Sequence, residues 1–384
     1  MGAIRVSALV ALATAATVHA QIPIRLDSFD EAPKPRAVKG PLSLDETTTE
    51  PASSQPASRA LPSPFDSPPF PLSDFLGPTI GAPDTTPDWA LQKLLNETPI
   101  GKLMKDGRNK TYGWFSPGFN WSTSKDSNSP AAYPLVPNKV VIDQIVLVTE
   151  RALDTVQKDH FDWGYHVLGL YGTDYRYMIA KGLWSDQLLK RNELYGWDVP
   201  EFDLRFYFPD IADGTTLKIG RWISTPDIEA CPTPANYLYT HSMTFSIDPY
   251  TYFGIMADVR LDKHWTVEIG LLGANDVAPW DESSQPNGHL MVRWVSDDNK
   301  DSIWGGINMI GAGKWKADHD DLQHLVATWT HKFDDKFHML TEGYYMWQQD
   351  GNLGGTINYG PVKNFGGGGG PGWFETGHTD SWGL

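Results

Sequence analysis

The chain has 384 residues, a formal net charge of -16 and a mean hydropathy of -0.37. Because it is acidic and has no basic run, we expect no nucleic acid as a partner. After the first twenty residues no stretch is apolar for long enough to make a membrane-spanning helix, so any membrane residence must use strands. Cys231 is the only cysteine, which excludes an intramolecular disulfide.

The N-terminal part divides into three segments. Residues 1–20 are typical of a secretory signal, with Arg5 as the charge, an apolar core and a small-residue cleavage site at Ala20. Residues 21–83 are rich in Pro, Ser and Thr, and we expect a disordered arm because they cannot bury enough apolar surface to offset chain entropy. Residues 84–111 are predicted to hold one short amphipathic helix, at 88–103, which acts as a plug or a periplasm-side cap or is an ordinary packed helix.

From residue 112 the chain alternates between apolar and polar residues in segments of about ten residues. Within residues 251–261, Phe253 and Val259 share one face of a strand, whereas Asp258 and Arg260 share the other. The same alternation recurs in four further segments, 160–171, 201–209, 264–273 and 288–296. Each segment therefore predicts a strand with one apolar and one charged face.

The connections between these segments alternate strictly in length. Short turns are predicted at 155–159, 210–215, 262–263, 297–301 and 334–335. Long loops are predicted at 122–138, 174–200, 225–250, 274–287 and 312–320. Eleven strands result, and a closed antiparallel barrel needs an even number, so a twelfth is expected at 356–365. We predict an all-β fold: a closed up-and-down transmembrane-type barrel of about 12 strands over residues 112–365, followed by a Gly-rich tail at 366–384.

Two details bear on where the strands would sit. Trp114, Trp222, Trp265 and Trp347 lie near predicted strand ends, where a membrane barrel carries aromatic girdles, although soluble β proteins also place aromatics at turns. Arg221 falls on the apolar side of its strand, which fits a contact with a plug or a rim better than lipid.

Several sequence blocks in the same order resemble the OmpL-like β-barrel porin family of the porin-2 type. They are 160–164 (HFDWG), 170–177 (LYGTDYRY), 220–230 (GRWISTPDIEA), 236–242 (NYLYTHS), 273–280 (GANDVAPW) and 327–333 (ATWTHKF). The resemblance implies an outer-membrane-type barrel that passes or binds small solutes and has no assigned catalytic residues. We therefore expect no enzyme activity, an exported protein, and a location in the outer membrane if the host has one, or otherwise secreted or at the cell surface.

If the chain forms this barrel, the charged faces of the strands line its lumen. The candidates are Asp162, His166, Asp203, Arg205, Lys218, Asp258, Arg260, Glu268, Arg293 and Glu342. Opposed acids and bases across a pore would select by size, polarity and charge; alternatively, these charges neutralise one another in a filled interior. The loops at 174–200 and 225–250 could constrict the passage, and the candidate loop residues are Asp227, Glu229 and Asp276. Membrane lipid and small polar solutes or ions are the expected partners, with the oligomeric state left open.

The alternative function is that of a soluble, secreted β-rich protein. Asp227 and Glu229 could act as paired carboxylates of a carbohydrate-active enzyme, or exposed tryptophans could serve a lectin-like module. A metal site at His319 and His324 is disfavoured, because a strand would point the two rings to opposite faces. No Gly-x-Ser-x-Gly elbow occurs, and no cofactor is expected.

Overall fold

The computed structural model describes residues 80–383 except 85–87, 126–127, 129–132, 226–227, 242–244, 246–248, 274–275, 282–283, 312–322, 335–336 and 353–375. The predictions for the signal segment, for nearly all of the N-terminal arm, for His319 and for a strand at 356–365 fall outside these residues.

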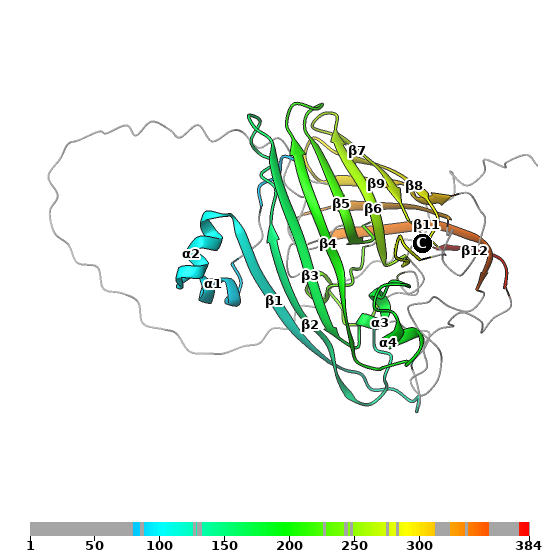
Figure 1. Cartoon of the computed structure of the whole chain (residues 1–384). Coiled ribbons are helices and arrows are strands. Elements are labelled where there is room, and N and C mark those ends of the chain that lie inside the picture. Colours follow the sequence, from blue (N-terminus) through cyan, green and yellow to red (C-terminus); the bar gives the residue numbers. More distant parts are fainter. Residues whose placement is uncertain are drawn as a thin grey trace, which may run out of the picture. The chain divides into compact units, whose positions relative to one another are not determined.

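The described strands form one antiparallel sheet in which neighbours along the chain are neighbours in space. Figure 1 shows them side by side in chain order. They are β1 Asn109–Phe119, β2 Val140–Arg151, β3 Asp162–Gly172, β4 Gly196–Phe208, β5 Thr215–Ile223, β6 Thr251–Arg260, β7 Trp265–Leu272, β8 Asn287–Val295, β9 Asp301–Gly311, β10 Gln323–Lys332, β11 His338–Asn352 and β12 Thr376–Gly383. Among the described residues the pairing ends at β12, and no pair joins β12 to β1. The all-β, up-and-down architecture is as predicted.

The twelfth strand lies in the segment that was predicted to be a Gly-rich tail. β12 pairs with β11 from Tyr344 to Asn352, so the prediction that residues 366–384 stay outside the sheet is wrong. The pairing uses backbone N–H and C=O groups on the side of β11 away from β10, and such groups can pair with a strand whatever its side-chain pattern. Side-chain alternation, on which the prediction relied, does not reveal such a strand.

The N-terminal segment forms two helices instead of the single one predicted at 88–103. They are α1 Ala90–Asn96 and α2 Pro99–Asp106. Pro99 has no N–H with which to continue α1, and Thr98 caps α2 by accepting a hydrogen bond from Gly101 N at 3.0 Å. The other helical turns are α3 Tyr175–Met178, α4 Asp186–Leu189 and the 3-10 turn η1 Thr233–Ala235. In Figure 1, α3 and α4 lie at the end of the sheet where β3 finishes.

One face of the sheet is apolar and exposed, and the other is charged and buried. On one face, which we call the outer face, large apolar side chains are exposed, such as Ile255 at 48% and Ile269 at 53%. On the opposite, inner face the charged side chains are buried, such as Arg260 and Glu268 at 3% each. A soluble sheet buries its apolar face and exposes its charges, so this sheet is inverted.

Contacts between distant strands show that the sheet curls around its inner face. Asn308 Nδ2 of β9 donates to Tyr252 Oη of β6 at 2.7 Å, although two strands lie between them. Three strand spacings in a flat sheet would separate these backbones by about 14 Å. Trp222 of β5 and Met346 of β11 even share one buried cluster. The inner face is therefore concave, and its side chains meet across it.

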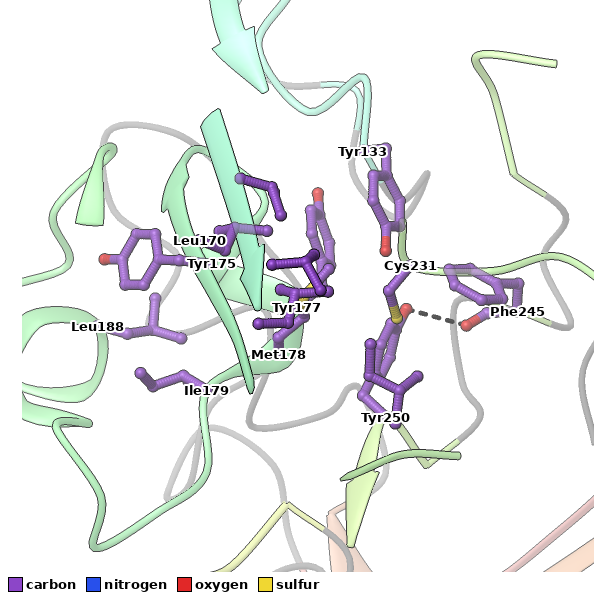
Figure 2. Close-up of a cluster of buried hydrophobic side chains, with 14 of the residues drawn as sticks. Tyr133, Leu170, Tyr175, Tyr177, Met178, Ile179, Leu188, Cys231, Phe245 and Tyr250 are labelled. Carbon is purple, nitrogen blue, oxygen red and sulfur yellow. Dashed lines mark hydrogen bonds between the residues drawn. The ribbon is translucent and has the colours of Figure 1, made fainter. Parts of the chain in front are cut away.

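A second buried cluster is built by loops that fold against inner-face residues of β1, β2 and β3 (Figure 2). Leu170 of β3 belongs to it together with Tyr133, Tyr177 and Tyr250 from three different loops. The rings of Tyr133 and Tyr177 stack with centroids 4.7 Å apart. Tyr250 Oη donates to Phe245 O at 2.9 Å, the bond drawn in Figure 2. The apolar core thus lies inside the curled sheet.

Two of the tryptophans predicted to form an aromatic girdle point inward instead. Trp222 is 1% exposed within an inner-face cluster, and Trp114 Nε1 donates to Gln144 Oε1 at 2.8 Å. Trp265 is on the outer face and 44% exposed. Alternation along the strand decides which side a ring takes, so nearness to a strand end was an insufficient criterion.

Arg221 lies on the outer-face side of β5, yet both it and its partner Asp198 are fully buried. Its Nη1 and Nη2 each donate to the carboxylate of Asp198 at 2.9 Å, and Nη2 also donates to Met178 O at 2.5 Å. Met178 belongs to the loop between β3 and β4, which covers this end of the sheet. The predicted contact of Arg221 with a rim is present.

Gly220 is expected to be irreplaceable in β5. Its φ is +147°, and an added Cβ would lie 2.2 Å from Phe202 O. Gly220→Ala should therefore lower stability by roughly 1–3 kcal/mol or more, measured as the midpoint of thermal unfolding by circular dichroism. Gly288→Ala is the control, because the nearest atom to its Cβ would be 3.6 Å away. Equal midpoints for the two variants would contradict the expectation.

Breaking the Arg221–Asp198 pair from one side should cost more than removing both charges. Arg221→Met leaves a buried carboxylate without its partner and is expected to destabilise the chain by about 3–5 kcal/mol. Adding Asp198→Asn removes that charge and should restore much of the loss. Denaturant unfolding of the single and double variants measures both effects. A double variant with a lower free energy of unfolding than Arg221→Met would refute the reasoning.

Candidate functional site

The ten charged residues predicted to face the lumen all lie on the inner face of the sheet. Around β2, β3 and β4 they form a chain of contacts. His166 Nδ1 is 3.0 Å from Glu150 Oε2, and its Nε2 is 3.8 Å from Glu201 Oε1. Next to it, Arg205 contacts the carboxylate of Asp203 through Nε at 2.5 Å and Nη2 at 3.0 Å. Acids and bases are interleaved here, so each charge has an opposite neighbour.

A second group continues the series over β5, β6, β7 and β8. His289 Nε2 lies 2.5 Å from Glu268 Oε1, and Asp258 is directly opposite Glu268 in the strand register. Lys218 lies with its ammonium 5.3 Å from the centroid of the Trp222 ring. These side chains are held by hydrogen bonds and ring contacts, which orient the charges across the concave face.

A third group lies at the short-turn end of the strands. Asp162 accepts a hydrogen bond from Arg108 Nη2 at 2.5 Å. Arg260 Nη1 donates to Ile80 O at 3.1 Å, which ties the start of the described chain to this end of the sheet. Arg293 is 6% exposed on the inner face of β8. Whether any of these groups borders a water-filled passage stays a prediction.

The loop between β5 and β6 folds onto the inner face and bridges strands that are far apart in the sheet. Ile228 N donates to Glu342 Oε2 of β11 at 2.8 Å. Gln144 Nε2 of β2 donates to Cys231 O at 2.7 Å. Since β2 and β11 are close to opposite ends of the strand order, one loop spans the concave face between them.

The three predicted loop residues fall in different places. Asp227 lies outside the described residues, and the half-buried Glu229 follows Ile228 on the bridging loop. Asp276 is fully buried in the loop between β7 and β8: its Oδ1 accepts from Thr251 N at 2.8 Å, and its C=O accepts from Lys181 N at 2.7 Å. Asp276 therefore joins two loops at the rim, whereas a role in constriction stays a prediction for all three residues.

Gln144 and Glu150 are inner-face residues that the sequence analysis did not single out. Gln144 holds the bridging loop, through Cys231 O and through Thr233 N at 3.2 Å, and Glu150 is the partner of His166. The available signal was polarity in an apolar strand. Gln144 and Glu150 are six residues apart, so they share the face of β2 that also carries Val146 and Val148, and a buried amide or carboxylate there has to meet a polar partner inside.

The N-terminal helices contact the free edge of β1. Gln92 Oε1 of α1 accepts a hydrogen bond from Thr111 N at 2.6 Å, and Trp89 packs against Tyr112 and Trp114 with ring centroids 4.9 and 6.1 Å away. These contacts cover backbone and inner-face aromatics at the start of the sheet. They show a helical segment packed against the sheet, and a role as a plug or a periplasm-side cap stays a prediction.

None of the helices in the described residues has the length and apolar character needed to cross a membrane. In the same part of the chain, no group of three or more His, Cys, Asp or Glu side chains is arranged to hold a metal ion.

Acid should stabilise the packing of the loop between β3 and β4. Asp174 is buried, and its Oδ2 accepts from Gln144 Nε2 at 2.9 Å. Burial, and then the nearby carboxylate of Asp143, raise the pKa of Asp174 well above its usual range. The folded chain therefore holds this proton more tightly than the unfolded chain, so stability falls as the pH rises above about 3.9, the unfolded value.

Asp174→Asn tests this dependence, because the amide is neutral and still offers an oxygen to Gln144. The variant should melt at a higher temperature than the wild type at pH 8 and lose part of the gain that the wild type shows on acidification to pH 5. Asp186→Asn, which changes an exposed acid of α4, is the control. A lower midpoint for Asp174→Asn at pH 8 would contradict the assigned direction.

Comparison with known proteins agrees with this geometry. No curated protein matches the chain, and neither does any solved structure. Residues 110–382 match the family model described as "Putative beta-barrel porin-2, OmpL-like". The match begins within β1, ends within β12 and covers more than half of the chain, which confirms the resemblance carried by the sequence blocks. The chain therefore belongs to this OmpL-like family of β-barrel porins.

Proposed function

We propose that the chain forms a closed outer-membrane-type barrel that passes or binds small polar solutes or ions through a charged interior. The observation that carries this proposal is the inversion of the sheet, which exposes its apolar side chains and buries its charges. Membership of the porin-like family supports it. The predicted export signal at residues 1–20 supports delivery to an outer membrane.

The outer face supports a lipid environment. Its middle carries exposed aliphatic side chains from seven strands: Leu147, Leu204, Ile219, Ile255, Ile269, Leu290 and Leu325. Toward the short turns the exposed residues become aromatic, as at Trp163, Trp265 and Trp329, and toward the long loops Tyr171 and Trp197 are exposed. An apolar band between two aromatic girdles is the surface that membrane barrels present to lipid.

The height of this apolar band is close to that found in outer-membrane barrels. Trp163 and Tyr171 lie at opposite ends of the outer face of β3, eight residues apart. That separation is about 26 Å along a strand, and a tilt of about 40° reduces it to about 20 Å along the membrane normal. Outer-membrane barrels have an apolar band about 25 Å tall, with aromatic residues at its margins.

Closure between β12 and β1 is expected in the same environment. Unpaired backbone N–H and C=O groups at an open edge have no water to bond within the hydrocarbon, so a spanning sheet must pair its two edges. In an up-and-down order of twelve strands, β1 and β12 run antiparallel to each other, which is the orientation that closure requires. We propose this pairing for the membrane-embedded chain.

The interior supports selection by charge and by size. Among the inner-face charges named above, the carboxylates outnumber the arginine and lysine side chains, so a passing cation would be favoured over an anion. The bridging loop, held at Glu342 and at Gln144, crosses the concave face, so we expect the passage to be narrow. We expect a small conductance and a weak preference for cations.

The alternative of a soluble carbohydrate-active enzyme or lectin-like module has less support. Such a protein requires a polar outer surface, because water does not tolerate a wide contiguous apolar patch. Here the exposed aliphatic residues adjoin one another over neighbouring strands. Strands of nine to thirteen residues, as in β1 to β6, also exceed the usual length in soluble sheets.

Planar bilayers test the proposal directly. The mature chain, purified in detergent, should be β-rich and should insert with stepwise conductance and a weak cation preference. In recordings at pH 9, Glu342→Gln removes a charge while its amide oxygen can still accept from Ile228 N. A unit charge about 8 Å from an ion in water contributes about 0.5 kcal/mol, so the cation preference should fall roughly two-fold.

Asp210→Asn, which changes an exposed acid in the turn between β4 and β5, should leave the preference unchanged. A mature chain that is monodisperse and β-rich without detergent, or that gives no conductance after verified insertion, would overturn the proposal.

A further inference from the structure

We propose that a cleft in the segment between β3 and β4 binds a saccharide at the outer surface of the protein. The cleft has a volume of about 530 Å³, within the range of small-molecule sites. Its principal lining residues are Tyr171, Trp184, Gln187, Arg191, Tyr195 and Trp197. This site is separate from the inner-face charges and does not depend on conduction.

Aromatic rings form two walls of the cleft. The rings of Trp184 and Trp197 lie 4.7 Å apart between centroids, and those of Tyr171 and Tyr195 stack with an interplanar angle of 14° at 6.4 Å. Trp184, Trp197 and Tyr171 are each between 41% and 46% exposed. A pyranose ring presents polarised C–H groups on its flat faces, and these pack against the electron-rich face of an aromatic ring.

Charged side chains line the cleft beside the aromatic rings. Arg191 and Glu193 contact each other at 2.6 Å between Nε and Oε1, and both side chains are substantially exposed. Asp186 is exposed beside them. Hydroxyl groups both donate and accept hydrogen bonds, so an adjoining carboxylate and guanidinium can satisfy them.

The backbone of the cleft is strained where it presents a ring. Trp184 has a φ of +53°, in the left-handed region that bulky residues rarely adopt. Such strain costs roughly 1–3 kcal/mol. The side chain of Trp184 is largely exposed, so its burial offsets little of this cost. Strained positions gather at ligand sites, where they aim a group that regular backbone could not aim.

A buried amide holds the two tryptophans in place. Gln187 is 4% exposed; its Nε2 donates to Trp197 O at 2.6 Å and to Trp184 O at 3.1 Å, and its Oε1 accepts from Trp197 N at 3.0 Å. The cleft is therefore preformed, which reduces the entropy lost when a ligand binds. Trp280 Nε1 also donates to Gly182 O at 3.0 Å and ties the cleft to the loop between β7 and β8.

The cleft begins at the margin of the apolar band. Tyr171 and Trp197 are paired in the strand register, at the long-loop end of the outer face. A saccharide there could be free in solution or be the headgroup of a glycolipid in the adjoining leaflet. Aromatic residues that only anchor the barrel in lipid need neither a preformed cleft nor a buried clamp behind them, so we favour a sugar ligand.

The test uses the full mature chain in nanodiscs. In one arm, plain phosphatidylcholine discs are titrated with maltotriose, cellotriose and tri-N-acetylchitotriose. In the other arm, the discs contain increasing fractions of a glycosyl diacylglycerol. Tryptophan fluorescence and saturation-transfer NMR should show saturable binding in at least one arm, and the arm that responds identifies the source of the sugar.

Variants link the signal to the cleft. Trp197→Ala should weaken binding roughly five- to tenfold, the worth of one aromatic contact. Trp184→Gly should do the same, since glycine accepts the positive φ and only the ring is lost. Trp163→Ala is the matched control, because Trp163 is 47% exposed at the other end of the outer face and lies outside the cleft. Circular dichroism verifies that each variant folds.

Loss of binding in both cleft variants with retention in Trp163→Ala supports the site. The proposal is overturned if no saccharide binds saturably in either arm, or if Trp163→Ala weakens binding as much as the cleft variants do. Either result would leave the conductance prediction untouched, because the conductance experiment contains no sugar.

Discussion

The structure depends on the pleat of its strands, which sends successive side chains to opposite faces. In this chain the outward side chains of the strands are largely apolar and exposed, whereas the inward ones bury the charged groups together with an apolar core. A sheet of that kind cannot be stable with its apolar face in water, and it cannot leave charges buried without partners. Both requirements are met together when lipid covers the outer face and the sheet curls around the inner one.

The charges that are buried on the inner face then have to be neutralised. The sheet does so by placing carboxylates beside basic side chains of neighbouring strands, as with His289 and Glu268, or His166 and Glu150. Because each of these pairs joins two strands, the charges also fix the register of the sheet. The same arrangement orients charges across the concave face, so the groups that make the interior stable are those that would act on a passing solute.

Loops fill part of the space inside the curled sheet. The loop between β5 and β6 reaches from Gln144 to Glu342, and aromatic residues of three loops pack with β3 in the cluster of Figure 2. Loops also build the rim, where Arg221 and Asp198 are buried under the segment between β3 and β4. The sheet provides the frame, whereas these folded-in segments determine which side chains lie on its concave face and at its long-loop end.

The sequence by itself determined the strands from β1 to β11, their alternating short and long connections, the opposite character of their faces and the sidedness of the ten candidate charges. These are local properties, since a period of two residues and a turn signal can be recognised within a dozen positions. Only the tertiary structure decided that β12 lies in the Gly-rich tail, that Trp114 and Trp222 point inward, and that Gln144 holds a loop some ninety residues away. Each of these depends on partners distant in the chain: a free backbone edge, a neighbouring inner-face cluster or a loop that folds back. No local pattern encodes such partners, because the contact exists only once the sheet has curled.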